Sequence, residues 1–119
     1  MNRTEIERSL NDLNTLVLKG KMLDAFDKYY HDDVIMQDNN LPATISKAEN
    51  RKREIEFLDN IVEFRGAKVK GMAVGDAISF VIWEYDYTHK EWGVRNYSQV
   101  SIQQWKDGKI INEQFIYSN

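Results

Sequence analysis

The chain has 119 residues, with 16 basic and 19 acidic side chains and a formal net charge of −3. This length suits one domain with a single core, and the negative charge would repel nucleic acid and anionic membranes. The lack of cysteine excludes disulfides and thiolate sites and suits a reducing compartment. The first residues lack the apolar stretch of a signal peptide, and no apolar run is long enough to span a bilayer. We therefore expect one cytoplasmic domain over residues 1–119, with no nucleic acid and no membrane as partner.

The chain begins with the apolar spacing of helices. Thr4 and Glu7 have the spacing of a capping box. Apolar residues at helical spacing then predict a buried stripe that ends at Gly20: Ile6, Leu10, Leu13, Leu16 and Val17. A second, short helix would carry three residues inward: Leu23, Phe26 and Tyr30.

A short strand and a third helix follow. Asp32 and Asp33 lead into "VIMQD", which predicts a strand, and "NNLPAT" predicts a loop. Ser46 and Glu49 again have capping-box spacing and open the third helix. Its inward residues would be Ala48, Ile55, Leu58 and Ile61. The run "ENRKREIE" mixes charges of both signs and is interpreted as a solvated helix face.

From Phe64 onward the sequence alternates and breaks at turn signals. Gly75 and Asp76, a loop near "HKEWG" and the "KDG" turn divide this half into four antiparallel strands. Both sets of alternating residues contain large apolar side chains, so both faces of the sheet should be covered. We expect the helices on the concave face and a second subunit on the convex face.

Two segments carry a family resemblance. "YYHDDVIMQDNNLP" and "QWKDGKIINEQFIY" resemble the tyrosine, acidic pair, strand and loop, and the closing hairpin, of the nuclear transport factor 2-like superfamily in its SnoaL-like branch. The resemblance implies an α+β fold: a cone-shaped barrel of a strongly curved, mostly antiparallel sheet wrapped around three N-terminal helices. It also implies a cavity at the open end of the cone and dimerisation through the sheet. Because the superfamily holds isomerases, dehydratases, cyclases and binding proteins, the fold alone does not give the function.

Ketosteroid isomerase, a member of that superfamily, pairs an aspartate base with a tyrosine and a protonated aspartic acid as oxyanion donors. Asp38 in "DDVIMQD" matches the position of the base. Leu13 or Asn14 stands where the isomerase has its tyrosine, and Ser101 stands where it has the second aspartic acid. Steroid-type isomerisation would lack its oxyanion donors here, so we exclude it.

Strand alternation and the resemblance together place a set of polar and aromatic side chains on the cavity side: Glu84 with Asp86, then Tyr97, Gln99 and Ser101, and finally Glu113, Phe115 and Tyr117. A carboxylate facing an aromatic, partly dry cavity has a raised pKa and can act as an acid or base near neutral pH. Asp38 and Glu113 are therefore the candidate catalytic residues. The alternative is that each carboxylate is hydrogen-bonded or reaches water at the mouth of the cone.

Other residues carry structural expectations. His31 lies at a helix end, where a cation is favourable, and His89 is expected to be solvated in a hairpin loop. The histidines and carboxylates show no ligand spacing, so neither a metal nor a cofactor is expected. The aromatic stripe of Trp83, Tyr85 and Tyr87 has the opposite parity to Glu84, which predicts convex-face packing or a homodimer interface.

Two classes of function follow from these features. The first is a cofactor-independent isomerase, dehydratase or cyclase that uses Asp38 or Glu113 for proton transfer on a small apolar carbonyl compound. The second is a non-catalytic dimeric module that holds an apolar ligand in its cavity.

Overall fold

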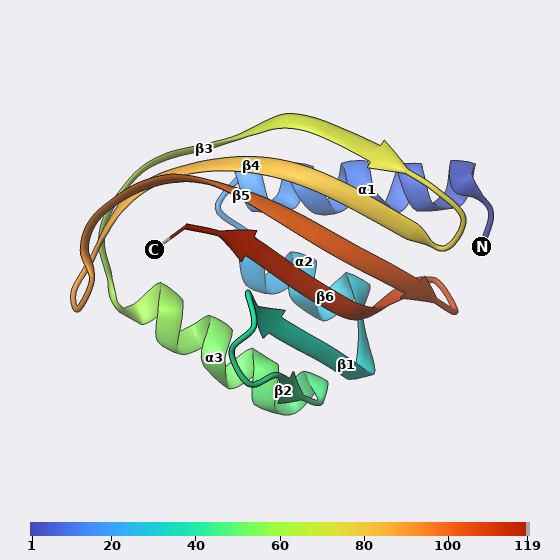
Figure 1. Ribbon diagram of the computed structural model, residues 1–119, viewed down its shortest axis with the longest axis horizontal. Helices are drawn as coiled ribbons and strands as arrows, with labels where there is room; N and C mark the ends of the chain where they lie inside the picture. The colour runs from blue at the N-terminus through green and yellow to red at the C-terminus, as the bar shows by residue number, and fades with distance from the viewer. Residues whose placement is uncertain (119) are drawn as a thin grey trace.

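A computed structural model describes residues 1–118, in which three helices precede or interrupt six strands (Figure 1). The helices are α1 (Arg3–Leu18), α2 (Met22–Tyr29) and α3 (Lys47–Asp59), and the strands are β1 (Tyr30–Asp38), β2 (Thr44–Ile45), β3 (Ile61–Val74), β4 (Ile78–His89), β5 (Gly93–Lys106) and β6 (Lys109–Tyr117). The predicted α+β class, with three helices and a strongly curved sheet, is confirmed. Within the described residues, no helix is both long and apolar enough to cross a membrane.

The strands form one mixed sheet in the order β2-β1-β6-β5-β4-β3. The only parallel pairing described is β1 with β6, and the other neighbours are antiparallel. The long strands arch over the helices, and α3 lies across the opening from them (Figure 1). Three register shifts interrupt the pairing of β3 with β4. Because bulges bend a strand and increase its twist, these shifts account for the curl at this edge.

Local signals in the sequence explain where several elements begin and end. Ser46 caps α3, since its Oγ accepts the backbone N–H of Glu49 at 3.2 Å. The cap of α1 is Asn2 rather than Thr4, because the Asn2 Oδ1 accepts the N–H of Glu5 at 2.9 Å. The predicted "KDG" turn joins β5 to β6, and Asp107 and Gly108 both have positive φ angles, 53° and 82°. Two such residues are what a tight hairpin turn of type I′ requires.

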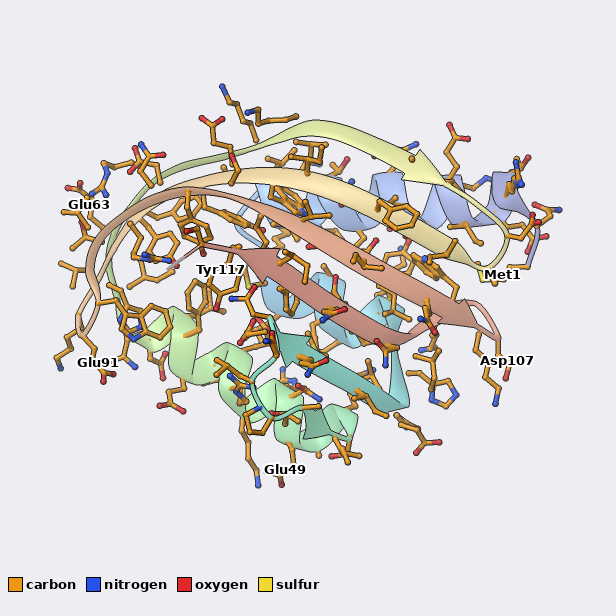
Figure 2. The ribbon with its side chains drawn as sticks, in the orientation of Figure 1. Met1, Glu49, Glu63, Glu91, Asp107 and Tyr117 are labelled. Carbon is orange, nitrogen blue, oxygen red and sulfur yellow. The ribbon has the colours of Figure 1, made fainter. Side chains whose placement is uncertain are left out.

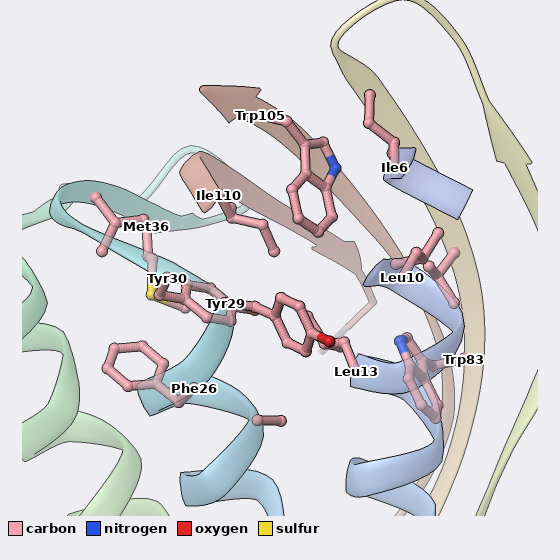
Figure 3. Packing of buried hydrophobic residues seen from close by; sticks show 13 residues of the cluster. Ile6, Leu10, Leu13, Phe26, Tyr29, Tyr30, Met36, Trp83, Trp105 and Ile110 are labelled. Carbon is pink, nitrogen blue, oxygen red and sulfur yellow. The ribbon is translucent and has the colours of Figure 1, made fainter. Parts of the chain in front are cut away.

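The hydrophobic core lies between the concave face of the sheet and helices α1 and α2. Figure 3 shows two sides of it: Phe26, Tyr30 and Met36 on one, and Leu10, Leu13 and Trp83 on the other. The ring of Phe26 stacks on that of Tyr30 with a centroid distance of 4.6 Å. The predicted inward residues of the helices are largely correct, although Ala48 is exposed. Tyr30 and Ile61 are the first residues of β1 and β3 rather than part of α2 and α3.

The structure reverses the predicted parity of β4. Trp83 and Tyr87 are buried, with 3% and 2% of their surface exposed, and they point to the concave side together with Tyr85. The expectation that this aromatic stripe packs on the convex face was therefore wrong. Glu84 instead points outward, where its carboxylate pairs with Lys68 and Lys70, both at 3.6 Å.

Asp86 also points away from the cavity and pairs with Arg65 at 2.8 Å. The placement of both acidic residues of β4 on the cavity side was therefore wrong. The physical reason is that Trp and Tyr rings bury more apolar surface than the stems of Glu and Asp, so the aromatic set takes the covered face.

Candidate functional site

A cavity of about 300 Å³ lies between the concave face of the sheet and helix α3. Aromatic side chains form much of its wall, and Figure 2 shows Tyr117, one of them, beneath the arch of the long strands. Ligand pockets in proteins begin at about this volume and are usually apolar with a few placed polar groups. Three of the carboxyl groups that line it, those of Asp38, Glu54 and Glu113, have a pKa raised by burial and provide such polar groups here.

Glu113 lies on β6 and is 2% exposed. The hydroxyl of Tyr30 donates to its Oε1, and the Gln103 Nε2 donates to its Oε2 at 2.9 Å. The orientation of the Gln103 amide is fixed, because its Oε1 accepts the Ser79 hydroxyl at 2.6 Å while Ser79 accepts the indole N–H of Trp105 at 2.9 Å. Both oxygens of Glu113 are therefore engaged.

Burial raises the pKa of Glu113 to about 7, and the negative charge of Asp38 adds to this rise. The two hydrogen bonds favour the charged form and oppose it. Glu113 and Asp38 are close because β1 pairs in parallel with β6, with Met36 opposite Glu113 and Asp38 opposite Phe115. The fold thus joins two carboxyl groups that are far apart in the sequence. A group with a pKa near 7 can hold or release a proton at neutral pH.

Asp38 lies at the end of β1, with its side chain 27% accessible. Its Oδ2 is 3.4 Å from the Nη2 of Arg53, and the Nη1 of the same guanidinium donates to the Thr44 hydroxyl at 2.7 Å. Burial raises the pKa of Asp38, and the charge and hydrogen bond of Arg53 oppose that rise. Asp38 is therefore an ion-paired carboxylate in the wall of the cavity.

Glu54 is the third carboxyl group and comes from α3. Asn50, Glu54 and Phe57 are spaced by four and three residues, so they share the helix face that lines the cavity. Asn50 holds this face in place through its Nδ2, which donates to the backbone carbonyls of Thr44 and Ser46 at 2.9 and 2.8 Å. Burial raises the pKa of Glu54 to about 7, and the charges of Glu113 and Asp38 add to the rise.

Tyrosines line the sheet side of the cavity. The Tyr87 and Tyr97 hydroxyls are 2.9 Å apart, and Tyr97 packs near Tyr117 with a centroid distance of 5.5 Å. The ring of Tyr85 stacks on Trp83 at 5.5 Å. Burial raises the pKa of Tyr85, and the nearby charges of Glu113 and Glu54 raise it further, so its phenol stays protonated. The wall thus presents neutral hydroxyl groups within an aromatic surface.

His89 lies at the rim of the cavity rather than in solvent. It is the last residue of β4, is 4% exposed, and stacks on Trp92 with a centroid distance of 3.7 Å. Its Nδ1 accepts the backbone N–H groups of Glu91 and Trp92 at 3.1 and 3.3 Å. The expectation of a solvated His89 was therefore wrong, because the hairpin end folds back over Phe57 and closes part of the mouth.

The structure brings most of the predicted site residues to the cavity wall: Asp38, Tyr97, Gln99, Ser101, Glu113, Phe115 and Tyr117. Glu84 is not among them, for the reason given above. The sequence analysis missed Glu54, because "ENRKREIE" was interpreted as a solvated face. The available signal was the helical spacing of Glu54 with Phe57, an apolar residue that needs cover.

Among residues 1–118, no group of three or more His, Asp or Glu side chains is arranged to hold a metal ion. The three cavity carboxyl groups instead sit among hydrogen-bond donors and aromatic rings of the chain itself.

The chain belongs to the SnoaL-like domain family, whose model matches residues 4–117. No match to a curated protein was found. A candidate SnoaL-like polyketide cyclase from Mesorhizobium loti is similar in structure, with a TM-score of 0.84 and 24% identity over 92% of this chain and 97% of the other. An NTF-2 like protein of unknown function from Burkholderia xenovorans has a TM-score of 0.78 and 18% identity over 98% of this chain and 84% of the other. A further similar structure is an LEH-like epoxide hydrolase from M. tuberculosis, with a TM-score of 0.78 and 12% identity over 98% and 84%. At these identities the likeness shows the shared fold.

Proposed function

We propose that the chain binds a small, largely apolar carbonyl compound in its cavity and moves a proton on it as a cofactor-independent isomerase, dehydratase or cyclase. The observation that carries the proposal is the gathering of Asp38, Glu54 and Glu113 in one aromatic cavity. Burial gives two of these groups a pKa of about 7. Each of the three reactions needs an acid and a base that exchange a proton near neutral pH.

The proposed chemistry begins at a carbon next to the carbonyl. A carboxylate removes a proton from this carbon, and the electrons of the C–H bond move into an enolate whose negative charge rests on the oxygen. Hydroxyl groups of the wall, such as that of Tyr97, stabilise this oxygen by donating hydrogen bonds. Return of the proton at another carbon gives isomerisation, loss of a neighbouring hydroxyl as water gives dehydration, and attack of the enolate on a second carbonyl gives cyclisation.

Asp38 and Glu113 have different parts in this proposal. Arg53 favours the charged form of Asp38 and so opposes the rise that burial gives its pKa, which makes Asp38 a source of negative charge at the wall. Glu113 is protonated or charged according to pH and is linked through Gln103 and Ser79 to the core. The remaining predicted contacts, Gln99, Ser101 and Phe115, shape the cavity beside them.

Proton exchange on a simple ketone tests this function. 2-Tetralone is a small apolar carbonyl compound, and its α-protons exchange with D₂O in a reaction that proton NMR follows directly. We expect the wild-type protein to accelerate this exchange with saturation, and Asp38→Asn and Glu113→Gln to slow it. If 2-tetralone changes the tryptophan fluorescence, to which Trp83 and Trp92 of the wall contribute, but its protons exchange at the buffer rate, the protein is the non-catalytic binding module.

A homodimer formed through the convex face of the sheet would use other residues than the predicted aromatic stripe. Neighbouring strands bring apolar side chains together on the convex side, with Ile82 opposite Val100 and Val100 opposite Ile116. Phe80, Ile82 and Ile116 are 37%, 42% and 41% exposed. We propose that this row, rather than the aromatic stripe, mediates a homodimer. Light scattering at micromolar concentration should give twice the chain mass, and Ile82→Lys should return the mass of one chain.

A further inference from the structure

The three cavity carboxyl groups differ in their hydrogen-bond partners. Both oxygens of Glu113 accept hydrogen bonds, from Tyr30 and Gln103. Asp38 is paired with Arg53. Within residues 1–118, neither a hydrogen bond nor an ion pair reaches the carboxyl group of Glu54. A ligand would meet two partnered oxygens at Glu113, a carboxylate already paired with Arg53 at Asp38, and a carboxyl group without a partner at Glu54.

The oxygens of Glu54 are open to the cavity. Buried polar groups without a partner are costly and rare, and in the described residues the one fully buried side-chain N or O atom without a partner is the Oδ1 of Asn14. The unpaired carboxyl oxygens of Glu54 therefore keep some accessible surface. Glu54 lines the cavity, so this surface faces the space that a ligand would fill.

Tyr85 is open in the same way. No side chain in the described part of the chain hydrogen-bonds its hydroxyl, although it also lines the cavity. By contrast, the neighbouring hydroxyls of Tyr87 and Tyr97 bond each other. Glu54 lies near enough to Tyr85 for its charge to act on the phenol. The helix side and the sheet side of the same cavity thus each contribute an unpaired polar group.

We propose that Glu54 and Tyr85 are the pair that contacts the ligand, with Glu54 exchanging a proton with a carbon of the ligand and Tyr85 donating a hydrogen bond to the ligand's oxygen. This inference rests on the proposed function, since it assigns the proton transfer to one group of the cavity. Glu113 and Asp38 then act as positioning residues through their charges. The ligand class follows: a flat, apolar C–H acid whose acidic carbon and oxygen acceptor are close enough to meet one carboxyl group and one phenol together.

A probe without a carbonyl group separates this inference from the proposed function. 5-Nitrobenzisoxazole is a flat C–H acid with a ring oxygen. A carboxylate takes the proton from its C3, the C–H electrons form the third bond of a nitrile, and the N–O bond breaks with its electron pair going to the oxygen. The product is a coloured cyanonitrophenolate, and the reaction needs no other reactant. Tyr85 would donate to the oxygen as its negative charge develops.

We expect Glu54→Gln to lower kcat/KM for this elimination by about 100-fold, the low end of what a positioned general base contributes. Tyr85→Phe should lower it by about tenfold, as expected for one hydrogen bond to developing charge. Glu49→Gln is the matched control, because Glu49 is on the same helix, is exposed, lies outside the cavity lining, and loses the same charge. It should leave the rate at the wild-type value.

Chemical rescue keeps the inference testable if Glu54→Gln folds poorly. Glu54→Ala leaves space beside the ligand, and added formate should restore part of its elimination rate, while Glu49→Ala, outside the cavity lining, should not respond to formate. A Glu54→Gln protein that eliminates at the wild-type rate while Glu113→Gln loses it would overturn the inference. If the elimination depends on Glu54 but 2-tetralone does not exchange, the inference stands and the carbonyl function fails. If the wild type accelerates neither reaction, both are wrong.

Discussion

The two faces of strands β4 and β5 both carry large side chains, but the side chains differ in kind. The concave face carries aromatic rings beside amide and hydroxyl groups, with Trp83 opposite Gln99 and Tyr85 opposite Tyr97. The convex face combines the apolar row around Ile82 with ion pairs such as that of Glu84 and Lys68. Acidic residues on a strand are therefore a poor guide to the functional face, since lysines on the next strand can pair with them in solvent.

The largest expected difference between the faces is in stability. Trp83→Ala removes a side chain that is 3% exposed, and we expect it to lower the free energy of unfolding by roughly 3–5 kcal/mol. Ile82→Ala, one residue away on the convex face and 42% exposed, should cost about 1 kcal/mol in the monomer. Urea denaturation at low protein concentration measures both. Equal losses would contradict the assignment of the two faces.

The second difference is in pH dependence. The folded chain holds protons on Glu54 and Glu113 up to a pKa of about 7, whereas the unfolded chain releases them near its ordinary value of about 4.3. Between these values the folded state binds more protons, so the free energy of unfolding should fall as pH rises from about 5 to about 8. Each group contributes at most roughly 4 kcal/mol to this fall.

The control for this prediction is Glu54→Gln, which cannot titrate at residue 54. Comparing its unfolding free energy with that of the wild type across the same pH range cancels the contributions of the other titrating groups. Parallel curves for the two proteins would mean that the carboxyl group of Glu54 is hydrated in the folded state, and the basis for its acid–base role would be lost.

Local signals made much of the fold predictable. The apolar stripe around Leu10, the cap at Ser46 and the turn at Gly108 depend on short-range spacing, and all three are present. The family resemblance supplied the curvature of the sheet. The parallel pairing of β1 with β6 joins distant parts of the chain, so short-range patterns could not have given it.

The site was less predictable than the fold. Asp38 and Glu113 were placed in the cavity by the resemblance and by strand alternation. The parity of β4 was ambiguous because both of its residue sets are amphipathic, and only the cover provided by α1 and α3 decides which set turns inward. Glu54 was hidden in a charged helical run, where spacing alone does not distinguish a solvated glutamate from one under a sheet.

A third, smaller difference is expected in ligand binding along β6. Phe115→Ala and Tyr117→Ala remove aromatic surface from the cavity wall. Each should raise the dissociation constant of an apolar fluorescent probe by about tenfold. Ile116→Ala is the matched control, because Ile116 lies between them, points to the convex side and is 41% exposed. Fluorescence titration gives the three dissociation constants. If only Ile116→Ala weakened probe binding, Ile116 rather than Phe115 and Tyr117 would face the cavity.

The smallest effect is expected at Glu84, which the sequence placed in the cavity and the structure places on the convex face. Its carboxylate is 3.6 Å from the ammonium groups of Lys68 and Lys70, and its side chain is 34% accessible. Solvent screens such pairs, so Glu84→Gln should change the free energy of unfolding by less than about 1 kcal/mol, and less still in high salt. Probe binding and 5-nitrobenzisoxazole elimination should stay at wild-type values, whereas the same substitution at Glu54 should slow the elimination by about 100-fold. If Glu84→Gln lost probe binding or elimination while its stability stayed intact, the side chain of Glu84 would face the cavity and not the convex side.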